Sequence, residues 1–369
     1  MKLGRSKRQT VRLPLYIVSF LLVFCGLTSE CAQGMFLLGP YPQSAQIDSV
    51  IISWKTTTPT TQNEVHWGRD PTLGNVTKEN SLFGKTKHTV KLEGLTTGQN
   101  YFYTVVSDHI ESALYTFWTV FPSNSTVRFV AYGDSQGVWD SWQTVLLVSQ
   151  TIEKEHPVFV LKPGDLVDDG TNATQWIDFF HASPFLHNST LYPVLGNHEQ
   201  YSFLFFSYFS LPNNECWYSF DNGPVHLVGL DSNSPNRYRF RQFLWLVHDL
   251  RTHHQPFTIV YFHHPVYSSS EHGNTTLLQK IWAPVFERCH VDIVFNGHDH
   301  NYEHSRVNGV VYIVTGGGGS PLYDNGQSPW TVYSEKTYHY CLLTVNSSTL
   351  LFEAKKPDGL VFDSFILTT

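Results

Sequence analysis

Five short motifs in the second two-thirds of the chain each place oxygen or nitrogen ligands just after a run of β-forming apolar residues. The runs cover residues 127–132, 158–161, 191–195, 258–262 and 291–295. The motifs are Gly133-Asp134-Ser135-Gln136, Gly164-Asp165-Leu166-Val167-Asp168, Gly196-Asn197-His198-Glu199, His263-His264-Pro265 and Gly297-His298-Asp299-His300. Ligands of open α/β sheets bind beyond the carboxyl ends of the strands. The pattern therefore predicts that five strands deliver ligands to one edge, as a hydrolytic metal site requires.

Segments with helical character separate these runs. They cover residues 142–155, 175–181, 239–252 and 276–289. Alternation of strands and helices predicts a layered α/β domain, which we place at residues 123–369. Residues 338–345, 350–353 and 361–367 are expected to be closing antiparallel strands, and the Gly- and Ser-rich loop 316–334 is a candidate rim of the site.

The preceding part of the chain has a different pattern. Short strands are predicted at residues 49–54, 63–67, 88–92, 100–106 and 114–119. Such regular short strands indicate a β-sandwich, which we place at residues 33–122. Trp54 lies where a sandwich carries a core aromatic. The segment from Gly94 to Tyr101 resembles the loop and corner tyrosine of a fibronectin type III domain. No catalytic cluster occurs in this region.

The first residues have the pattern of a targeting segment. Five basic side chains precede an apolar stretch at residues 13–27, and small residues near Ala32 could be a cleavage point. The stretch is short for a membrane span. We therefore favour a cleaved signal peptide at residues 1–32 and a secreted protein without a stable membrane span. An uncleaved anchor and a location in the endomembrane lumen remain alternatives.

Charge excludes one class of partner. Residues 1–32 hold five basic and one acidic side chain, so the remaining chain has 19 Lys and Arg against 30 Asp and Glu, a net charge of −11. Phosphate-backbone binding needs a basic surface, and nucleic acid is therefore not an expected partner. The sequence leaves the oligomeric state open.

The cysteines form neither a zinc spacing nor a dense disulfide framework, whereas the glycosylation sequons fit a secreted glycoprotein. Cys216, Cys289 and Cys341 lie far apart, so one disulfide with an odd thiol is compatible with the chain, and the pair is undetermined. Six Asn-X-Ser/Thr sequons are candidate glycosylation sites: Asn75, Asn124, Asn172, Asn188, Asn274 and Asn346.

The motifs indicate phosphate ester hydrolysis. Two metal ions overcome the negative charge of a phosphate ester by clamping its oxygens and by lowering the pKa of a bound water. A closely spaced pair of ions needs a shared carboxylate, and we assign that role to Asp165.

On these motifs the chain resembles the calcineurin-like metallophosphoesterases and, within them, the purple acid phosphatases. A fibronectin-like domain followed by this motif series is the layout of the plant-type enzymes. The resemblance implies that Asp165 bridges two metals and that His198 contacts the phosphate and assists departure of the leaving group. It implies two ligand sets, Asp134 and His300 for the first metal and Asn197, His263 and His298 for the second.

Several neighbouring residues have less direct roles. His263, two residues before proline, is the expected ligand, and His264 is expected to pack beside it. His272 lies nine residues after His263, where the plant-type enzymes carry a substrate-contacting histidine; a plain loop histidine is the alternative. Tyr302 and Glu303 are expected to be structural.

Two positions depart from the family pattern. Asp168 stands where purple acid phosphatases carry the tyrosinate that binds ferric iron, so the purple colour should be absent. Gln136 stands where other metallophosphoesterases carry a histidine, and its amide oxygen would be a weak ligand. Both are candidate additional ligands. We expect two exchangeable divalent ions, of zinc, manganese or iron.

Three functions agree with these observations. The leading hypothesis is a secreted, acid phosphatase-like enzyme with two metal ions, which hydrolyses small phosphomonoesters through a metal-bound hydroxide. The second is a phosphodiesterase or nucleotide pyrophosphatase on the same site. The third is a non-catalytic secreted binding protein that has lost a metal.

Overall fold

The computed structural model describes residues 35–369 apart from residues 80, 82 and 234–235. The predicted signal peptide at residues 1–32 lies outside the described residues. Within the described part, no helix combines the length and apolar character that a membrane crossing requires.

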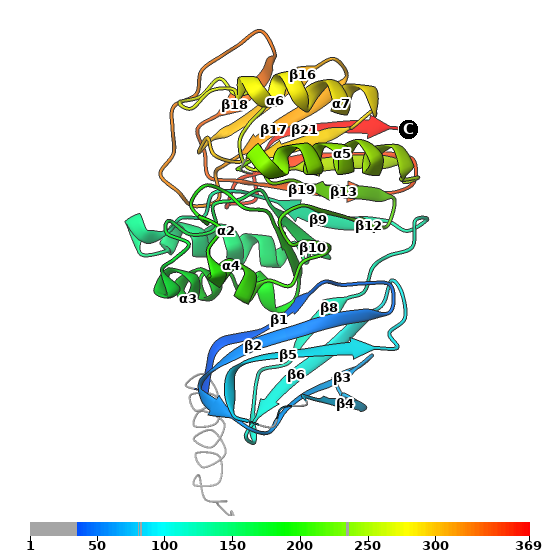
Figure 1. Ribbon diagram of the computed structural model, residues 1–369, viewed down its shortest axis with the longest axis vertical. Coiled ribbons are helices and arrows are strands. Elements are labelled where there is room, and N and C mark those ends of the chain that lie inside the picture. The colour runs from blue at the N-terminus through cyan, green and yellow to red at the C-terminus, as the bar shows by residue number, and fades with distance from the viewer. Residues whose placement is uncertain (1–34, 80, 82, 234–235) are drawn as a thin grey trace, which may run out of the picture.

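The amino-terminal part is a two-sheet sandwich (Figure 1). One sheet has the order β1-β2-β5, with β1 at Phe36–Gln43, β2 at Ser49–Thr60 and β5 at Lys85–Glu93. The other has the order β4-β3-β6-β7, with β8 also pairing β6; its strands are β3 at Asn63–Gly68, β4 at Asn75–Lys78, β6 at Asn100–Ser107, β7 at Ile110–Glu111 and β8 at Tyr115–Trp118.

Both aromatic residues singled out in this domain occupy the expected places. Trp54 is buried in the core between the sheets, and its Nε1 donates a hydrogen bond to Ser107 Oγ at 2.9 Å. The hydroxyl of Tyr101 accepts a hydrogen bond from the Thr96 backbone N–H at 2.9 Å. This is the tyrosine-corner contact that secures the turn before a sandwich strand.

The sandwich is fixed to the α/β part by hydrogen bonds. Tyr41 Oη donates to the Tyr208 carbonyl at 2.8 Å, and Tyr103 Oη donates to the His187 carbonyl at 2.7 Å. The backbone N–H of Thr116 donates to Asn188 Oδ1 at 2.9 Å. A boundary between residues 122 and 123 remains our proposal; it falls between β8 and the next strand, β9.

Two sheets form the centre of the α/β part. The first has the order β11-β10-β9-β19-β20-β21, with β9, β10 and β11 parallel. Its strands are β9 at Val127–Ala131, β10 at Phe159–Lys162, β11 at Thr190–Pro193, β19 at Tyr340–Val345, β20 at Thr349–Lys355 and β21 at Val361–Thr368. The second has the order β12-β13-β14-β15-β17-β16-β18, with strands β12 at Tyr218–Asn222, β13 at Val225–Gly229, β14 at Phe257–Tyr261, β15 at Ile293–Asn296, β16 at Tyr302–Val307, β17 at Val310–Thr315 and β18 at Thr331–Glu335.

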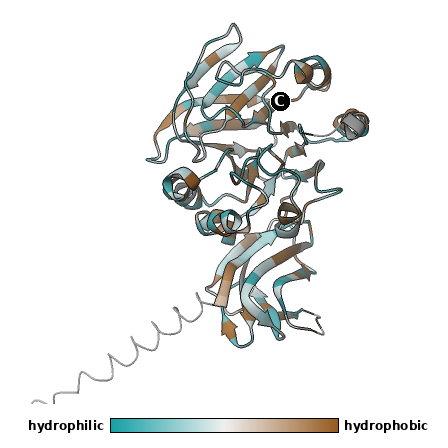
Figure 2. Cartoon of the chain, turned by 60° about the vertical axis from the view of Figure 1, so that its left-hand side comes forward, coloured by the Kyte–Doolittle hydropathy of each residue, from teal (hydrophilic) through white to brown (hydrophobic). Residues whose placement is uncertain are grey.

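Helices cover the outer faces of these sheets (Figure 1). The first group comprises α2 at Gln143–Lys154, α3 at Ala173–His181 and α4 at Phe203–Tyr208, with 3-10 turns η1 at Val138–Asp140 and η2 at Pro184–His187. The second group comprises α5 at Asn236–Thr252, α6 at Thr276–Ile281 and α7 at Ala283–Arg288. Helices seen end-on in Figure 2 carry both hydrophobic and hydrophilic residues, as expected when one face packs on a sheet.

Packing explains the layers. One core cluster joins the first sheet, the facing side of the second sheet and α2 and α3; it includes Phe129, Val145, Trp176, Phe295 and Phe352. The other side of the second sheet packs against α5 to α7 through a separate cluster that includes Leu246, Val260, Phe262, Phe286 and Val294. The predicted α/β/β/α layering is confirmed.

Two expectations need correction. The five motif-bearing strands do not share one sheet edge, because β9, β10 and β11 belong to one sheet and β14 and β15 to the other. The predicted helix at 276–289 is two helices, α6 and α7, which separate at Trp282. Pro284 lies in the first turn of α7; a proline inside a continuous helix would remove a hydrogen bond and clash with the preceding turn.

The disulfide that the sequence left open does not form among the described cysteines. Cys216, Cys289 and Cys341 are free thiols. Cys341 is buried in β19, with its Sγ 3.5 Å from Thr315 Oγ1.

A buried histidine remote from the motifs predicts a pH-dependent stability. His226 on β13 bonds Asp221 Oδ1 at 2.7 Å and Asp249 Oδ2 at 2.9 Å, and His253 stacks on its ring. Burial alone would lower the pKa of His226, but the two carboxylates outweigh burial and raise the pKa to about 9. A histidine whose pKa is raised in the folded state contributes its full stabilisation when the pH is below its unfolded pKa of about 6.5. That contribution is lost as the pH rises through the folded-state pKa.

We therefore expect the free energy of unfolding to fall between pH 7 and pH 10, and to fall less in a His226→Gln variant. Urea unfolding at three pH values measures the difference. His254→Gln, an exposed residue of the next loop, is the control. Equal pH dependence in the wild type and His226→Gln would contradict the assignment.

Candidate metal centre

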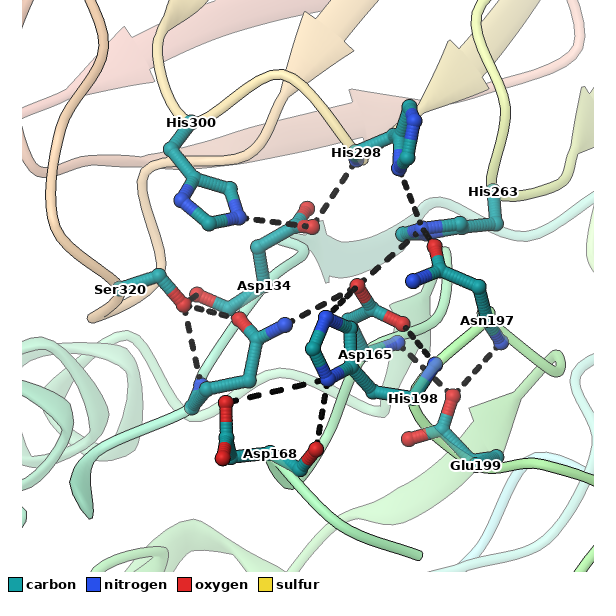
Figure 3. A network of polar contacts seen from close by, with 12 residues as sticks. Asp134, Asp165, Asp168, Asn197, His198, Glu199, His263, His298, His300 and Ser320 are labelled. Atoms are coloured by element: carbon teal, nitrogen blue, oxygen red, sulfur yellow. Dashed lines mark hydrogen bonds and ion pairs between the residues drawn. The ribbon is translucent and has the colours of Figure 1, made fainter.

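The motif residues of both sheets converge on one cluster (Figure 3). Asp134, Asp165 and Asn197 follow β9, β10 and β11 of the first sheet, whereas His263 and His298 follow β14 and β15 of the second. Because parallel strands end on the same side of a sheet, each sheet presents its ligands at one edge, and the two edges meet. The cluster thus lies between the sheets.

The most compact group surrounds His263 Nε2. This atom lies 2.9 Å from Asn197 Oδ1, 3.1 Å from His298 Nδ1 and 3.2 Å from Asp165 Oδ2. His263 Nδ1 donates to the Pro163 carbonyl at 3.0 Å, which leaves Nε2 free to be a ligand. Asp165, His263 and His298 form a group able to hold a metal ion. With Asn197, this group combines the ligands that the resemblance implies for the second metal with the proposed bridging residue, Asp165.

A second group lies around Asp134. Its Oδ1 accepts a hydrogen bond from the His298 backbone N–H at 2.9 Å and lies 3.6 Å from His300 Nε2. Its Oδ2 is buried and has no hydrogen-bond partner. His300 Nδ1 donates to the Pro321 carbonyl at 2.9 Å, which turns Nε2 toward Asp134. A buried carboxylate oxygen is normally hydrogen-bonded, so the open Oδ2 fits a cation ligand.

Backbone conformation brings these ligands together. Asp134, Asp165 and His298 have φ values of 56°, 51° and 70°, in the left-handed region that residues other than glycine seldom adopt. Strained conformations of this kind cluster at functional sites. At Gly297 a Cβ atom would clash with Asp134 Oδ2, so glycine is required where the two sheets meet.

The electrostatics of the cluster favour a bound cation. Burial, together with the Asp165 carboxylate, raises the pKa of Asp134 to about 8. Burial would also raise the pKa of Asp165, but His263 and hydrogen bonds hold it below its usual range. Two buried carboxylates with imidazole and amide ligands are a donor set suited to zinc, manganese or iron.

His198 and His272 border the ligand groups. His198 Nδ1 donates to the Asp168 carbonyl at 2.6 Å, and its Nε2 lies 3.9 Å from Asp165 Oδ2. The His272 ring stacks on His298 with centroids 4.2 Å apart, and its backbone N–H donates to Asp299 Oδ1 at 2.9 Å. The structure therefore brings both histidines to the cluster.

Gln136 and Asp168, the two residues that depart from the family pattern, make contacts other than those expected of a metal ligand. Gln136 Nε2 donates to Asp165 Oδ2 at 3.0 Å, while its amide oxygen accepts from Ser320 Oγ. The Asp168 side chain is 55% exposed, and its contact at the site is with His198 Nδ1 at 3.8 Å. In this arrangement neither side chain presents an oxygen to the ligand groups.

The remaining predicted neighbours are structural. His264 Nδ1 bonds Ser232 Oγ at 2.8 Å, Tyr302 Oη donates to Asp363 Oδ2 at 2.6 Å, and Glu303 accepts hydrogen bonds from Ser269. The predicted loop 316–334 is shorter than expected, because residues 331–334 belong to β18. The rest of it borders the site: the Pro321 carbonyl accepts a hydrogen bond from His300, and the Tyr323 ring stacks on His300 with centroids 4.2 Å apart.

Sequence reasoning missed three buried residues. The carboxylate of Glu199 accepts the backbone N–H groups of Asp165, Leu166 and Gly196 at 2.6–2.9 Å, which fixes two motif loops together. Lys162 Nζ has no hydrogen-bond acceptor, lies 3.9 Å from the Tyr132 ring centroid and interacts with the site carboxylates. A lysine that ends an apolar strand could have been noticed; Ser320, which bonds Gln136, had no distinguishing pattern.

Three protein-family models match successive parts of the chain. A model described as purple acid phosphatase, N-terminal domain, matches residues 41–119. A calcineurin-like phosphoesterase model matches residues 127–302, and one described as iron/zinc purple acid phosphatase-like protein C matches residues 309–364. The first model covers the sandwich, and the other two cover strands of both sheets of the α/β part.

Individual proteins agree with these matches. Purple acid phosphatase 21 of Arabidopsis thaliana is 28% identical over 354 residues, which cover 83% of this chain and 79% of that protein. A nucleotide pyrophosphatase/phosphodiesterase of Hordeum vulgare is 32% identical over 187 residues, covering 41% of this chain and half, 50%, of that protein. The solved structure of purple acid phosphatase PPD1 from yellow lupin (Lupinus luteus) has the same fold, with a TM-score of 0.77 at 21% identity, covering 89% of this chain and 74% of that chain.

Proposed function

Since this chain is a purple acid phosphatase-like member of the calcineurin-like phosphoesterases, we propose that it hydrolyses small phosphomonoesters at the cluster around Asp165. The observation that carries the proposal is the convergence of Asp165, Asn197, His263 and His298 within hydrogen-bond distance of one atom, His263 Nε2. Oxygen and nitrogen ligands this close together are expected to share a cation.

Two ions would be held by the chain in this proposal. Asn197, His263 and His298 would hold one, Asp134 and His300 would hold the other, and Asp165 would touch both. When bound, such ions neutralise phosphoryl oxygens and lower the pKa of a coordinated water. The identity we propose is divalent zinc, manganese or iron, because no tyrosine stands at position 168.

His198 is suited to act on the substrate. Its Nδ1–H is engaged with the Asp168 carbonyl, so Nε2 is the atom available for a ligand. Burial by itself would lower the pKa of His198, but Asp165 and Asp168 outweigh it and raise the pKa. A protonated Nε2 could donate to a phosphate oxygen or to the leaving alcohol. His272, beside His298, would be a second substrate contact.

Secretion is part of the proposal. Of the six sequon asparagines, Asn75, Asn124, Asn172 and Asn274 are exposed, as glycosylation requires. Asn188 and Asn346 are partly buried, and Asn188 Oδ1 already accepts a hydrogen bond from the sandwich. We therefore propose glycans at the four exposed positions.

Hydrolysis of phosphodiesters is the second candidate, and the match to the barley nucleotide pyrophosphatase/phosphodiesterase favours it. A comparison of rates on an aryl phosphate and a bis-aryl phosphate separates the two functions. We expect kcat/KM to be higher for the monoester by at least about tenfold, a difference of 1.36 kcal/mol in transition-state binding. Hydrolysis confined to the diester would reject the first function, and metal-supplemented protein without either activity would support the non-catalytic alternative.

A further inference from the structure

The bridging carboxylate is contacted on its Asp134 side by a neutral amide. Gln136 Nε2 donates to Asp165 Oδ2 at 3.0 Å, and His263 Nε2 lies 3.2 Å from the same oxygen on the other side. Asp165 Oδ1 accepts from the His198 backbone N–H at 3.0 Å. The oxygen that would serve both metal groups is therefore already engaged by an N–H donor.

Ser320 holds this amide in place. Its hydroxyl contacts the Gln136 amide oxygen, and the Gln136 backbone N–H donates to Ser320 Oγ at 3.1 Å. Ser320 is itself tied to the Asp134 carbonyl, through its backbone N–H at 3.2 Å and its Oγ at 3.1 Å. Both residues are buried, with Ser320 at 0% and Gln136 at 5% exposure. Figure 3 shows Ser320 to the left of Asp134, on the side opposite His263.

The two ligand groups differ in how closely their ligand atoms approach one another. On the His263 side, three ligand atoms lie within 3.2 Å of Nε2. On the Asp134 side, one imidazole approaches one carboxylate oxygen at 3.6 Å, and the other oxygen has no partner. The open oxygen is an unused acceptor that a cation could take, while the Asp165 oxygen that such a cation would share is bonded to Gln136.

We propose that Gln136 and Ser320 form a latch on Asp165, so that the centre binds its two ions unequally. One ion binds tightly at Asn197, His263 and His298. The second ion, beside Asp134 and His300, binds only when the Gln136 amide leaves Asp165 Oδ2. Gln136 is thus a positioning residue that acts through the bridging carboxylate. This inference rests on the metal centre of the proposed function and adds an order of loading to it.

Metal binding measured directly tests the latch. Protein stripped with a chelator is titrated with Zn²⁺ by calorimetry, and bound zinc per chain is counted by mass spectrometry. Wild type should bind one ion tightly and a second at least about tenfold more weakly. Ser320→Ala and Gln136→Ala should each strengthen the second site by about 10- to 100-fold, the range over which outer-shell partners change metal affinity. Gln136→His, which removes the latch and adds an imidazole, should strengthen it further.

Several outcomes would reject the latch. Weaker second-ion binding in Gln136→Ala would mean that the amide oxygen is a ligand. Two equally tight ions in the wild type, with phosphatase activity intact, would reject the latch and leave the proposed function standing. Absence of any tightly bound ion would reject both. Ser149→Ala, a buried hydroxyl of α2 without a hydrogen-bond partner, is the matched control and should leave both affinities unchanged.

Discussion

Replacement of Asp165 by asparagine should abolish phosphate ester hydrolysis and lower the metal content of the protein. Asp165 contacts the compact group, with its Oδ2 3.2 Å from His263 Nε2, and it also interacts electrostatically with Asp134 of the other group. An asparagine has no charge with which to hold two cations. Because metal-ion clamping contributes several kcal/mol to the transition state, kcat/KM should fall by at least about 10³-fold.

The Asp165→Asn experiment needs both activity and metal content. Asp48→Asn, an exposed carboxylate of the sandwich, controls for the loss of one negative charge. Circular dichroism verifies that the fold survives the substitution of a residue with a φ of 51°; asparagine tolerates this conformation well. Retention of two bound ions and more than a tenth of the wild-type rate would disprove the bridging role.

Replacement of His198 by alanine should slow turnover and leave the metal content intact. The His198 imidazole is 36% exposed and bonds Asp168 rather than the compact ligand group, so its removal takes no ligand from the ions. General acid–base groups typically contribute about 10²- to 10⁴-fold in rate, and kcat should fall within that range. The backbone N–H of residue 198, which bonds Asp165, is retained.

The choice of substrate sharpens the His198 prediction. If His198 protonates the leaving alcohol, hydrolysis of an alkyl phosphate should fall far more than hydrolysis of a nitrophenyl phosphate, whose leaving group needs no proton. Equal losses on the two substrates would argue for phosphate binding instead. Loss of bound metal would show that the residue is structural. His254→Ala, an exposed histidine, is the control.

Much of the site was predictable because its ligands directly follow strands. An apolar run identifies a strand, and the polar residue at its end identifies a candidate ligand, so Asp134, Asp165, Asn197, His263 and His298 were placed at one site, where the structure brings them together. Their role as ligands stays a prediction. The division of the strands between two sheets was not predictable, because a run of apolar residues does not encode its pairing partner. Strands β12, β13, β16, β17 and β18 were missed, although they complete the second sheet.

The contacts of Gln136 could not be predicted from sequence either. The position departs from the family pattern, but the departure does not say what the glutamine does there. Its role depends on Ser320, 184 residues later in the chain, and on the direction in which one amide points. Spacing within a motif carries no information about such a contact. The buried carboxylate of Glu199 is similar, since its partners are backbone N–H groups of another motif.

The location of the centre between two sheets gives bound metal a mechanical role. Asp165 and Asn197 follow strands of one sheet, and His263 and His298 follow strands of the other. An ion held by all four would therefore cross-link the two sheets. Separation of the sheets then requires release of the ion. When the free metal concentration is 100 times the dissociation constant, binding of this ion would add about 2.7 kcal/mol to the free energy of unfolding. The supply of metal would thus regulate the lifetime of the folded protein as well as its catalysis.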